Sequence, residues 1–165
     1  MHNMADKLII REILEKDDLA LEDVKRMFQS LYDAEGPDQA IQLKEDGAEI
    51  WLQGVRKGLG RFGMICIASL DGNNVGFAHG SLRILPDFYG GQKIGYISHV
   101  FVDETARKKG VGEGLVRKLE QWFADKEVHS VELEVLINNE AGIAFWERMG
   151  YPNELLQCRK MGNKL

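Results

Sequence analysis

The sequence has few cysteines and no long hydrophobic run. Its 165 residues include two cysteines, Cys66 and Cys158, without the close spacing of metal ligands. Such isolated thiols are typical of a reducing compartment rather than of a disulfide framework. No apolar stretch approaches the roughly 20 residues that span a bilayer. The stretch 1–13 also lacks the apolar core of a secretion signal. We therefore expect a cytoplasmic protein with no metal and no membrane partner.

Positive charge is in deficit as well. Lysine and arginine number 21 against 26 aspartates and glutamates, so the formal net charge is -5. With this balance we expect no nucleic-acid partner. The chain has no repeat, no low-complexity tract and no linker-like segment, and it is long enough to bury one core. The sequence therefore predicts a single domain that covers residues 1–165.

Hydrophobic periodicity predicts the order β α α β β β α β α β. Apolar residues at helical spacing predict helices that begin near Asp17 and at about residue 38, followed by helices over 111–126 and 139–150. Apolar runs predict six strands, over 7–13, 62–70, 75–84, 93–102, 130–137 and 154–161, and the first of these runs is rich in β-branched residues. The residues "DGNN" (71–74) predict a tight turn that joins the second and third strands into a hairpin.

One motif combines cations with glycines. In "ARKKGVGEGL" (106–115), three cations precede three glycines at the entrance of a predicted helix, namely Arg107, Lys108, Lys109, Gly110, Gly112 and Gly114. A helix N-terminus presents unpaired N–H groups and a partial positive charge, and glycine lets a ligand approach the backbone closely. The motif therefore predicts a site for a phosphate or pyrophosphate group.

Two familiar phosphate loops fit this motif less well. A Walker A loop ends in Gly-Lys-Ser/Thr, which is missing here, and this argues against nucleoside triphosphate hydrolysis. A dinucleotide-binding loop needs glycine at the sixth place of GxGxxG, where Leu115 stands. Glu132 does lie about where a ribose-binding acid would be. Dinucleotide binding is therefore kept as a weaker interpretation.

The loop "RKKGVG" resembles the Arg/Gln-x-x-Gly-x-Gly/Ala signature of the GNAT superfamily of acyl-CoA dependent N-acetyltransferases. Residues 133–151, "LEVLINNEAGIAFWERMGY", are similar to that family's strand, asparagine, alanine-rich helix start and closing Gly-aromatic pair. The resemblance implies an α/β (α+β) fold with a mixed, mostly antiparallel sheet of six to seven strands, flanked by helices. It also implies that the fourth and fifth strands splay apart and that acetyl-CoA, the acyl donor, lies in the gap.

The resemblance further implies which residues hold acetyl-CoA. The main chain of the fourth strand would bond the pantetheine amides, and main-chain N–H groups from Lys108 to Glu113 would hold the pyrophosphate. Asn139 would face the cofactor from the last helix, and Trp146 would be either a core residue or a wall against the cofactor. The expected cofactor-binding residues are Val100, Phe101, Val102, Arg107, Lys108, Lys109, Gly110, Val111, Gly112, Glu113, Asn139 and Trp146.

Two residues are candidates for the catalytic base. A lysine-like amine, with a pKa of about 10.4, is mostly protonated at neutral pH and must lose a proton before it attacks. Glu134 stands five residues before Asn139, where one branch of the family carries its base, and His99 on the fourth strand is the second candidate. Both can also be structural. Glu134 would then lie on the solvent-exposed face of a strand, and His99 would be a hydrogen-bonded structural residue. His79 and His129 show no comparable context.

The oxyanion and the leaving thiolate also need partners. A bulge near residues 99–101 would free a main-chain N–H for the thioester oxygen. Trp146 stands where the family usually has a tyrosine that protonates the thiolate, and an indole is too weak an acid for that role. Because a thiol with a pKa of about 8.5 is a fair leaving group, catalysis does not require this acid. Tyr151 and Tyr96 stay open as substitutes.

Acidic residues dominate the segment that shapes the acceptor pocket in this family. Within residues 33–49, Lys44 is the one basic residue, and the acidic residues are Asp33, Glu35, Asp38, Glu45, Asp46 and Glu49. An acidic wall attracts a cationic amine, although the same residues can be a solvated helix face. We expect acetyl transfer to a primary amine of a small molecule or peptide by direct attack in a ternary complex. The alternative is a catalytically silent CoA-binding or sensor module, and a homodimer is left open.

Overall fold

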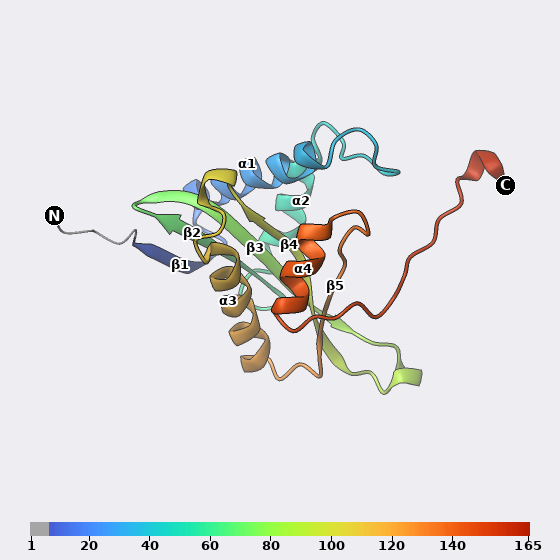
Figure 1. The fold of residues 1–165 in the computed structure, drawn as a ribbon. Coiled ribbons are helices and arrows are strands. Elements are labelled where there is room, and N and C mark those ends of the chain that lie inside the picture. The colour runs from blue at the N-terminus through green and yellow to red at the C-terminus, as the bar shows by residue number, and fades with distance from the viewer. Residues whose placement is uncertain (1–6) are drawn as a thin grey trace. The chain divides into compact units, whose positions relative to one another are not determined.

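The computed structural model describes residues 7–165, so the expectation for residues 1–13 falls partly outside it (Figure 1). The chain divides into two compact units at Leu133 and Glu134. The first unit holds the sheet and three helices: β1 (Leu8–Ile13), α1 (Asp18–Glu35), α2 (Gly47–Arg56), β2 (Gly63–Leu70), β3 (Asn73–Ile84), β4 (Lys93–Val102), α3 (Val111–Asp125) and β5 (Val131–Leu133).

The sheet is mixed and mostly antiparallel, as predicted. Its strand order is β1-β2-β3-β4-β5; the first four strands pair antiparallel, and β5 is parallel to β4. Asp71 and Gly72 both have positive φ, 49° and 84°, which is the backbone that a two-residue hairpin between β2 and β3 requires. The prediction of six to seven strands is not confirmed, because five strands are found within residues 7–165.

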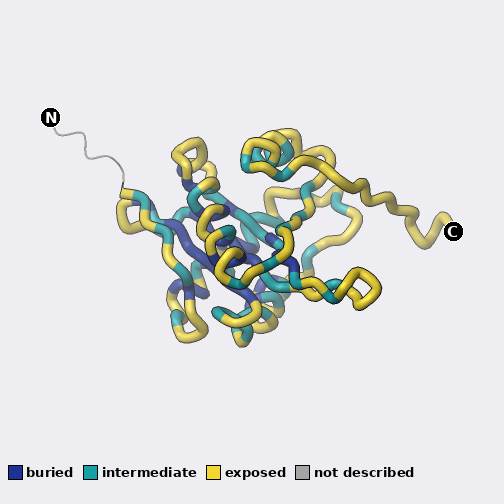
Figure 2. The backbone as a smooth tube through the Cα atoms, turned by 90° about the horizontal axis from the view of Figure 1, so that it is seen from below, coloured by how far each residue is buried: buried dark blue, intermediate teal, exposed yellow. Residues whose placement is uncertain are grey.

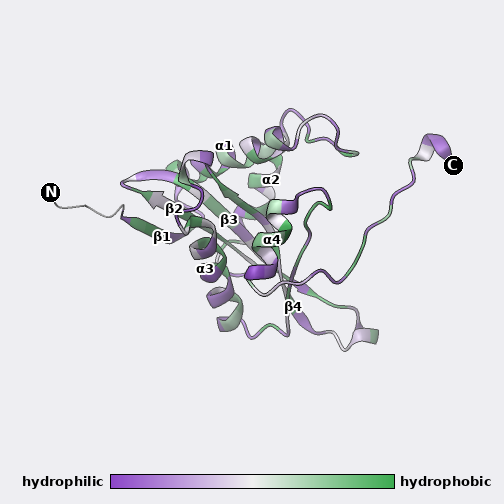
Figure 3. Cartoon of the chain, viewed as in Figure 1, coloured by the Kyte–Doolittle hydropathy of each residue, from purple (hydrophilic) through white to green (hydrophobic). Residues whose placement is uncertain are grey.

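Helices cover both faces of this sheet. The apolar stripe of α1 is buried, together with two residues of α2, against one face (Figure 1); these residues are Ala20, Leu21, Val24, Met27 and Phe28 of α1 and Ala48 and Leu52 of α2. On the other face α3 crosses the strands, and its exposed side is hydrophilic (Figure 3). Buried residues follow the strands and the inner sides of these helices (Figure 2). None of the described helices is both long and apolar enough to span a bilayer.

A β-bulge at Ser98 changes which face of the sheet β4 presents. His79 of β3 pairs with His99, but the next residue, Gly80, pairs with Ile97, so Ser98 is an extra residue in β4. Before the bulge, Gly95 lies against Phe123 of α3. After it, His99 lies on the α1 and α2 side. The bulge was expected near residues 99–101 and lies one residue earlier.

Three predicted elements differ from the structure. The helix expected over 38–57 begins only at Gly47, and the strand expected over 130–137 is reduced to Val131–Leu133. The second unit contains α4 (Glu140–Arg148), but residues 154–161, expected as a strand, form none and are exposed throughout (Figure 2). The neighbours Leu155 and Leu156 are 89% and 79% exposed. Adjacent leucines point to opposite sides of an extended chain, so this segment offers no single apolar face to a sheet.

Candidate functional site

The N-terminus of α3 has the geometry expected of an anion site. The backbone adopts positive φ at Lys108 and at Gly110, the N-cap residue, and no side chain caps the helix. The first intrahelical bond runs from Gly114 N–H to Gly110 O at 3.0 Å. The N–H groups of Val111, Gly112 and Glu113 therefore have no acceptor within the helix. A Cβ atom built on Gly110 would meet no atom within 4 Å, so the space beside this helix end is open.

Two residues of the motif have structural roles that the sequence did not indicate. The guanidinium of Arg107 donates to the Val102 carbonyl at 3.1 Å and ties the loop to the end of β4. Gly114 faces β1, where a Cβ atom would collide with the side chain of Ile10. Gly114 is thus needed for the close packing of α3 on the sheet rather than for the approach of an anion.

The edge of β4 beyond the bulge is open. β5 pairs only with Gly95, Tyr96 and Ile97, and within residues 7–165 no strand pairs with the same edge from Ser98 to Val102. The three residues expected to bind pantetheine, Val100, Phe101 and Val102, pair with β3 on their other side. Because main-chain groups alternate in direction along a strand, about half of those after the bulge point to the open edge. An extended ligand with amide groups fits such an edge.

His99 lies in a half-buried polar and aromatic cluster. Its Nε2 atom is 3.1 Å from the hydroxyl of Tyr32, and its Nδ1 atom is 3.0 Å from the hydroxyl of Ser98, which also contacts Nδ1 of His79. Trp51 meets the rings of both histidines edge-on. Burial lowers the pKa of His99 to about 4 and, together with the neighbouring His99, that of His79 to about 3. Both imidazoles are therefore neutral at neutral pH.

The sequence showed no comparable context for His79, and the structure links it to His99 through the hydroxyl of Ser98. Tyr32, Ser98 and Trp51 were not singled out from the sequence. His79 and His99 lie on strands that were predicted correctly. Placing these two strands side by side as an antiparallel pair could have predicted that the two histidines are neighbours. The face that His99 occupies depends on the bulge, which leaves no signal in the sequence.

A hollow at the C-terminal end of α1 adjoins this cluster. It is lined by Tyr32, Asp33 and Glu35 together with amides and apolar residues of the segment 36–43. Burial raises the pKa of Glu35. Of the other acids predicted to form the acceptor wall, Glu49 pairs with Lys25 and Asp46 pairs with Lys44. Asp33 and Glu35 are therefore the acids that face a hollow beside His99.

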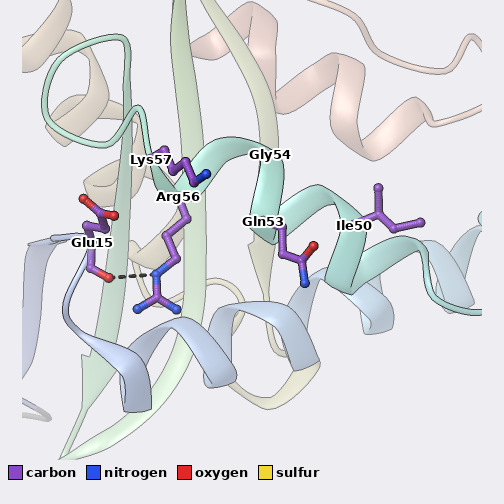
Figure 4. A pocket seen from close by; sticks show the side chains of 6 residues that line it. All are labelled: Glu15, Ile50, Gln53, Gly54, Arg56 and Lys57. Atoms are coloured by element: carbon purple, nitrogen blue, oxygen red, sulfur yellow. Dashed lines mark hydrogen bonds between the residues drawn. The ribbon is translucent and has the colours of Figure 1, made fainter.

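A larger hollow lies along α2 (Figure 4). Its lining residues include Glu15, Gln53, Arg56 and Lys57, and Arg56 closes one side by donating to the Glu15 carbonyl at 2.9 Å. Arg56 also forms a salt bridge with Asp18, so the guanidinium charge is already paired with a carboxylate. No residue predicted for the site lines this hollow, and we assign it no role.

The remaining predicted site residues belong to the second unit. The side chain of Asn139 accepts a hydrogen bond from the Gly142 N–H at 3.0 Å and so caps α4. Trp146 is half-buried, with its ring centroid 5.0 Å from Phe145 and 5.4 Å from Tyr151. Glu134 is exposed and directly follows β5. Their roles toward a cofactor stay predictions.

Residues 21–151 match the model of the acetyltransferase (GNAT) family. No curated protein matches the chain significantly. Among solved structures, the aminoglycoside N-acetyltransferase AAC(6')-Iy in complex with CoA has a TM-score of 0.76 at 17% identity, over 97% of this chain and 99% of that one. Glucosamine-6-phosphate N-acetyltransferase from Arabidopsis thaliana has a TM-score of 0.69 at 18% identity, over 95% and 99%. Identities this low show a shared fold alone.

Proposed function

The chain belongs to the GNAT acetyltransferase family, and from this premise we propose that it moves the acetyl group of acetyl-CoA to a primary amine by direct attack in a ternary complex. The observation that carries the proposal is the uncapped N-terminus of α3, which directly follows the open edge of β4. We also propose that both units act as one domain, since the matched residues 21–151 cross the boundary at Glu134.

The first unit offers two matching sets of groups to acetyl-CoA. The N–H groups at the start of α3, with the exposed cations Lys108 and Lys109 beside them, would hold the pyrophosphate. The main chain of Val100, Phe101 and Val102 would bond the pantetheine amides along the open edge. Once bound, acetyl-CoA supplies a thioester carbonyl that an amine can attack. Gly110 leaves room for this approach, because a Cβ atom there would project into open space.

The acceptor is proposed to be a cationic small molecule or peptide amine. Asp33 and Glu35 line the hollow beside the His99 cluster, and no cation is among its lining residues. Two carboxylates at one hollow attract an ammonium group and raise its local concentration. The names of the two relatives above mention aminoglycosides and glucosamine-6-phosphate. Amino sugars are therefore the first acceptors to test.

The chemistry requires one proton to leave the nitrogen as the amide forms. Glu134 and His99 are the proposed bases, and they differ in what surrounds them. Glu134 is exposed, whereas His99 is half-buried among aromatic rings and bonded to Tyr32. A group with a pKa of about 4, such as His99, cannot hold the proton of a free ammonium with a pKa of about 10.4. His99 can therefore act only on an amine that has already lost its extra proton.

An assay of CoA release tests the proposal. Purified protein is mixed with acetyl-CoA and a panel of amines: aminoglycosides, glucosamine-6-phosphate, polyamines and peptides with free amino groups. Steady release of the thiol with one class of amine, together with an acetylated product in the mass spectrum, is the expected result. CoA binding in calorimetry without turnover of any amine would instead favour the silent CoA-binding module, for which the tryptophan at position 146 is the main argument.

A further inference from the structure

The hydroxyl of Ser98 contacts three groups at once. It lies within hydrogen-bond distance of Nδ1 of His79, 3.0 Å from Nδ1 of His99 and 3.2 Å from the carbonyl oxygen of His79. A serine hydroxyl has one proton to donate and two lone pairs that accept. The carbonyl oxygen can only accept, so the single proton of Ser98 must point to it. All three hydrogen bonds can then form together in one arrangement of protons. In it Ser98 donates to the carbonyl, and both Nδ1 atoms carry a proton and donate to Ser98.

This arrangement leaves the lone pair of His99 on Nε2. Both histidines are neutral, so each ring carries one N–H and one bare nitrogen. With the proton of His99 on Nδ1, its Nε2 atom must accept the hydrogen bond that joins it to Tyr32 at 3.1 Å. The Tyr32 hydroxyl is the donor. His99 is therefore prepared as a base, and the group in front of its lone pair is Tyr32.

Tyr32 connects His99 with the hollow at the C-terminal end of α1. Its side chain is half-buried against Phe28, with ring centroids 4.9 Å apart, and it lines the same hollow as Asp33 and Glu35. Burial, followed by the nearby Glu35 and Tyr96, raises the pKa of Tyr32. The hydroxyl consequently keeps its proton at neutral pH. It can receive one proton on its oxygen only while it passes its own to His99.

We propose that Tyr32 is a catalytic residue of this chain, which passes the proton of the acceptor nitrogen to His99, while Ser98 and His79 hold His99 in the accepting tautomer. The proposal rests on the proposed acetyl transfer. As the C–N bond forms, the C–S bond breaks and its electron pair leaves with sulfur. The N–H bond breaks, its proton joins Oη of Tyr32, and the former hydroxyl proton moves to Nε2 of His99. The amide and Tyr32 end neutral, the thiolate carries the negative charge, and His99 carries the positive charge.

The weak basicity of His99 suits this step. A nitrogen that is becoming an amide loses nearly all of its own basicity, so a base with a pKa of about 4 can take the one proton that this nitrogen gives up. The same base leaves an ammonium untouched. The relay therefore acts late, on an amine that entered neutral, and His99 returns to its neutral state through Tyr32 once the product has left.

The variant Tyr32→Phe tests the relay, because it removes the hydroxyl and keeps the ring packed on Phe28. With the best amine of the panel, kcat should fall about 10²-fold while KM for acetyl-CoA stays within about twofold. Tyr89→Phe is the matched control, since Tyr89 is 65% exposed on the β3–β4 loop, and it should behave as the parent protein. A Tyr32→Phe protein with the kcat of the parent would overturn the role of Tyr32. Absence of turnover in the parent itself would instead overturn the acetyl transfer.

The tautomer of His99 gives a second test that needs no turnover. In ¹⁵N spectra of the imidazole rings, the parent protein should show a protonated Nδ1 and a bare Nε2 for His99. Tyr32→Phe should shift the Nε2 signal through loss of the hydrogen bond, and Ser98→Ala should release the fixed tautomer. A protonated Nε2 in the parent would exclude the relay, even if Tyr32→Phe proved inactive or failed to fold.

Discussion

Phe28 of α1 and Trp51 of α2 are stacked, with ring centroids 4.2 Å apart and planes inclined by 17°. The pair joins the two helices over one face of the sheet. The indole also stands edge-on to His79 and His99, at centroid distances of 5.5 Å and 5.3 Å. These rings exclude water from the histidines, and this exclusion lowers the pKa of both.

Replacing Trp51 should therefore destabilise the fold. Trp51→Leu removes the stacked ring and leaves space above the sheet, so we expect a loss of about 2–4 kcal/mol in the free energy of unfolding. Urea denaturation measures this loss. Phe88 is 82% exposed, and Phe88→Leu should change stability by less than about 0.5 kcal/mol. Equal stabilities of the two variants would contradict the structural role of the stack.

The two histidines should make stability depend on pH. Their folded-state pKa values, about 3 and about 4, lie below the ordinary 6.5. Below pH 6.5 the unfolded chain binds protons that the folded chain does not, so stability falls as pH drops from about 6.5 toward 4. Each histidine contributes at most about 1.4 kcal/mol per pH unit.

Urea denaturation between pH 7 and pH 5, where most carboxyl groups stay ionised, measures this dependence. His99→Asn should roughly halve the part of the slope that the two histidines contribute. The exposed residue His129 supplies the control, since His129→Asn should leave the slope as in the parent. A stability that is constant over this interval in the parent would mean that both rings bind protons in the folded state as they do in the unfolded chain.

A substitution at the start of α3 tests the CoA site. Gly112→Val places a branched side chain among the N–H groups that would hold the pyrophosphate. We expect CoA affinity to fall by about 2 kcal/mol, or about 30-fold, because charge-assisted hydrogen bonds are lost. Calorimetry with CoA measures the change. Gly54→Ala, at a helical glycine with open space around it, should bind as the parent does. Unchanged affinity in a folded Gly112→Val protein would exclude the assignment.

The close packing of Gly114 on Ile10 can be measured as a coupling energy. Gly114→Ala places a methyl group against the Cδ1 atom of Ile10. Ile10→Val removes that atom. The alanine should therefore be tolerated better in the valine background, by about 1 kcal/mol in a double-mutant cycle. Additive effects of the two substitutions would show that the side chain of Ile10 rotates away from the added methyl group without a cost in stability.

Trp146→Tyr restores the hydroxyl that the family pattern has at this position. If the thiolate leaves unassisted in the parent, kcat should rise by at most about tenfold. Because Trp146 packs against Phe145 and Tyr151, the smaller ring should also cost about 1–3 kcal/mol of stability. Turnover and thermal unfolding are measured on the same preparation. A variant that is as stable as the parent and no faster would contradict both expectations.

The elements that the sequence predicted well are those whose own residues determine them. β4 was placed at its observed bounds because an apolar, β-branched run follows the glycine pair Gly90 and Gly91 and ends before Asp103. The start of α3 at Val111 follows from Gly110, which adopts the left-handed conformation that glycine permits. The hairpin between β2 and β3 follows from the Asp-Gly pair in the same way.

The features that could not be predicted depend on distant residues. Residues 154–161 were expected to be a strand, but they pair with no strand within residues 7–165, and their sequence has no β-branched or aromatic residue to favour one. The cluster around His99 needs α1, α2, β3 and β4 to meet, so Tyr32 and Trp51 gained a role only in three dimensions. Asn139 was expected to face a cofactor, and the structure adds its use as a helix cap, which the sequence equally permits.

The bulge at Ser98 also has a consequence for evolution and for protein engineering. Odd-numbered residues of β4 face α3 before the bulge, as Gly95 does, and face α1 and α2 after it, as His99 and Phe101 do. Because Ser98 is the extra residue, deleting it would restore an uninterrupted ladder in which Ile97 still pairs with Gly80 and His99 with His79, so both keep the faces that they occupy. Loss of this one residue would therefore remove the hydroxyl that joins the two histidines, while every other side chain of β4 keeps its face of the sheet.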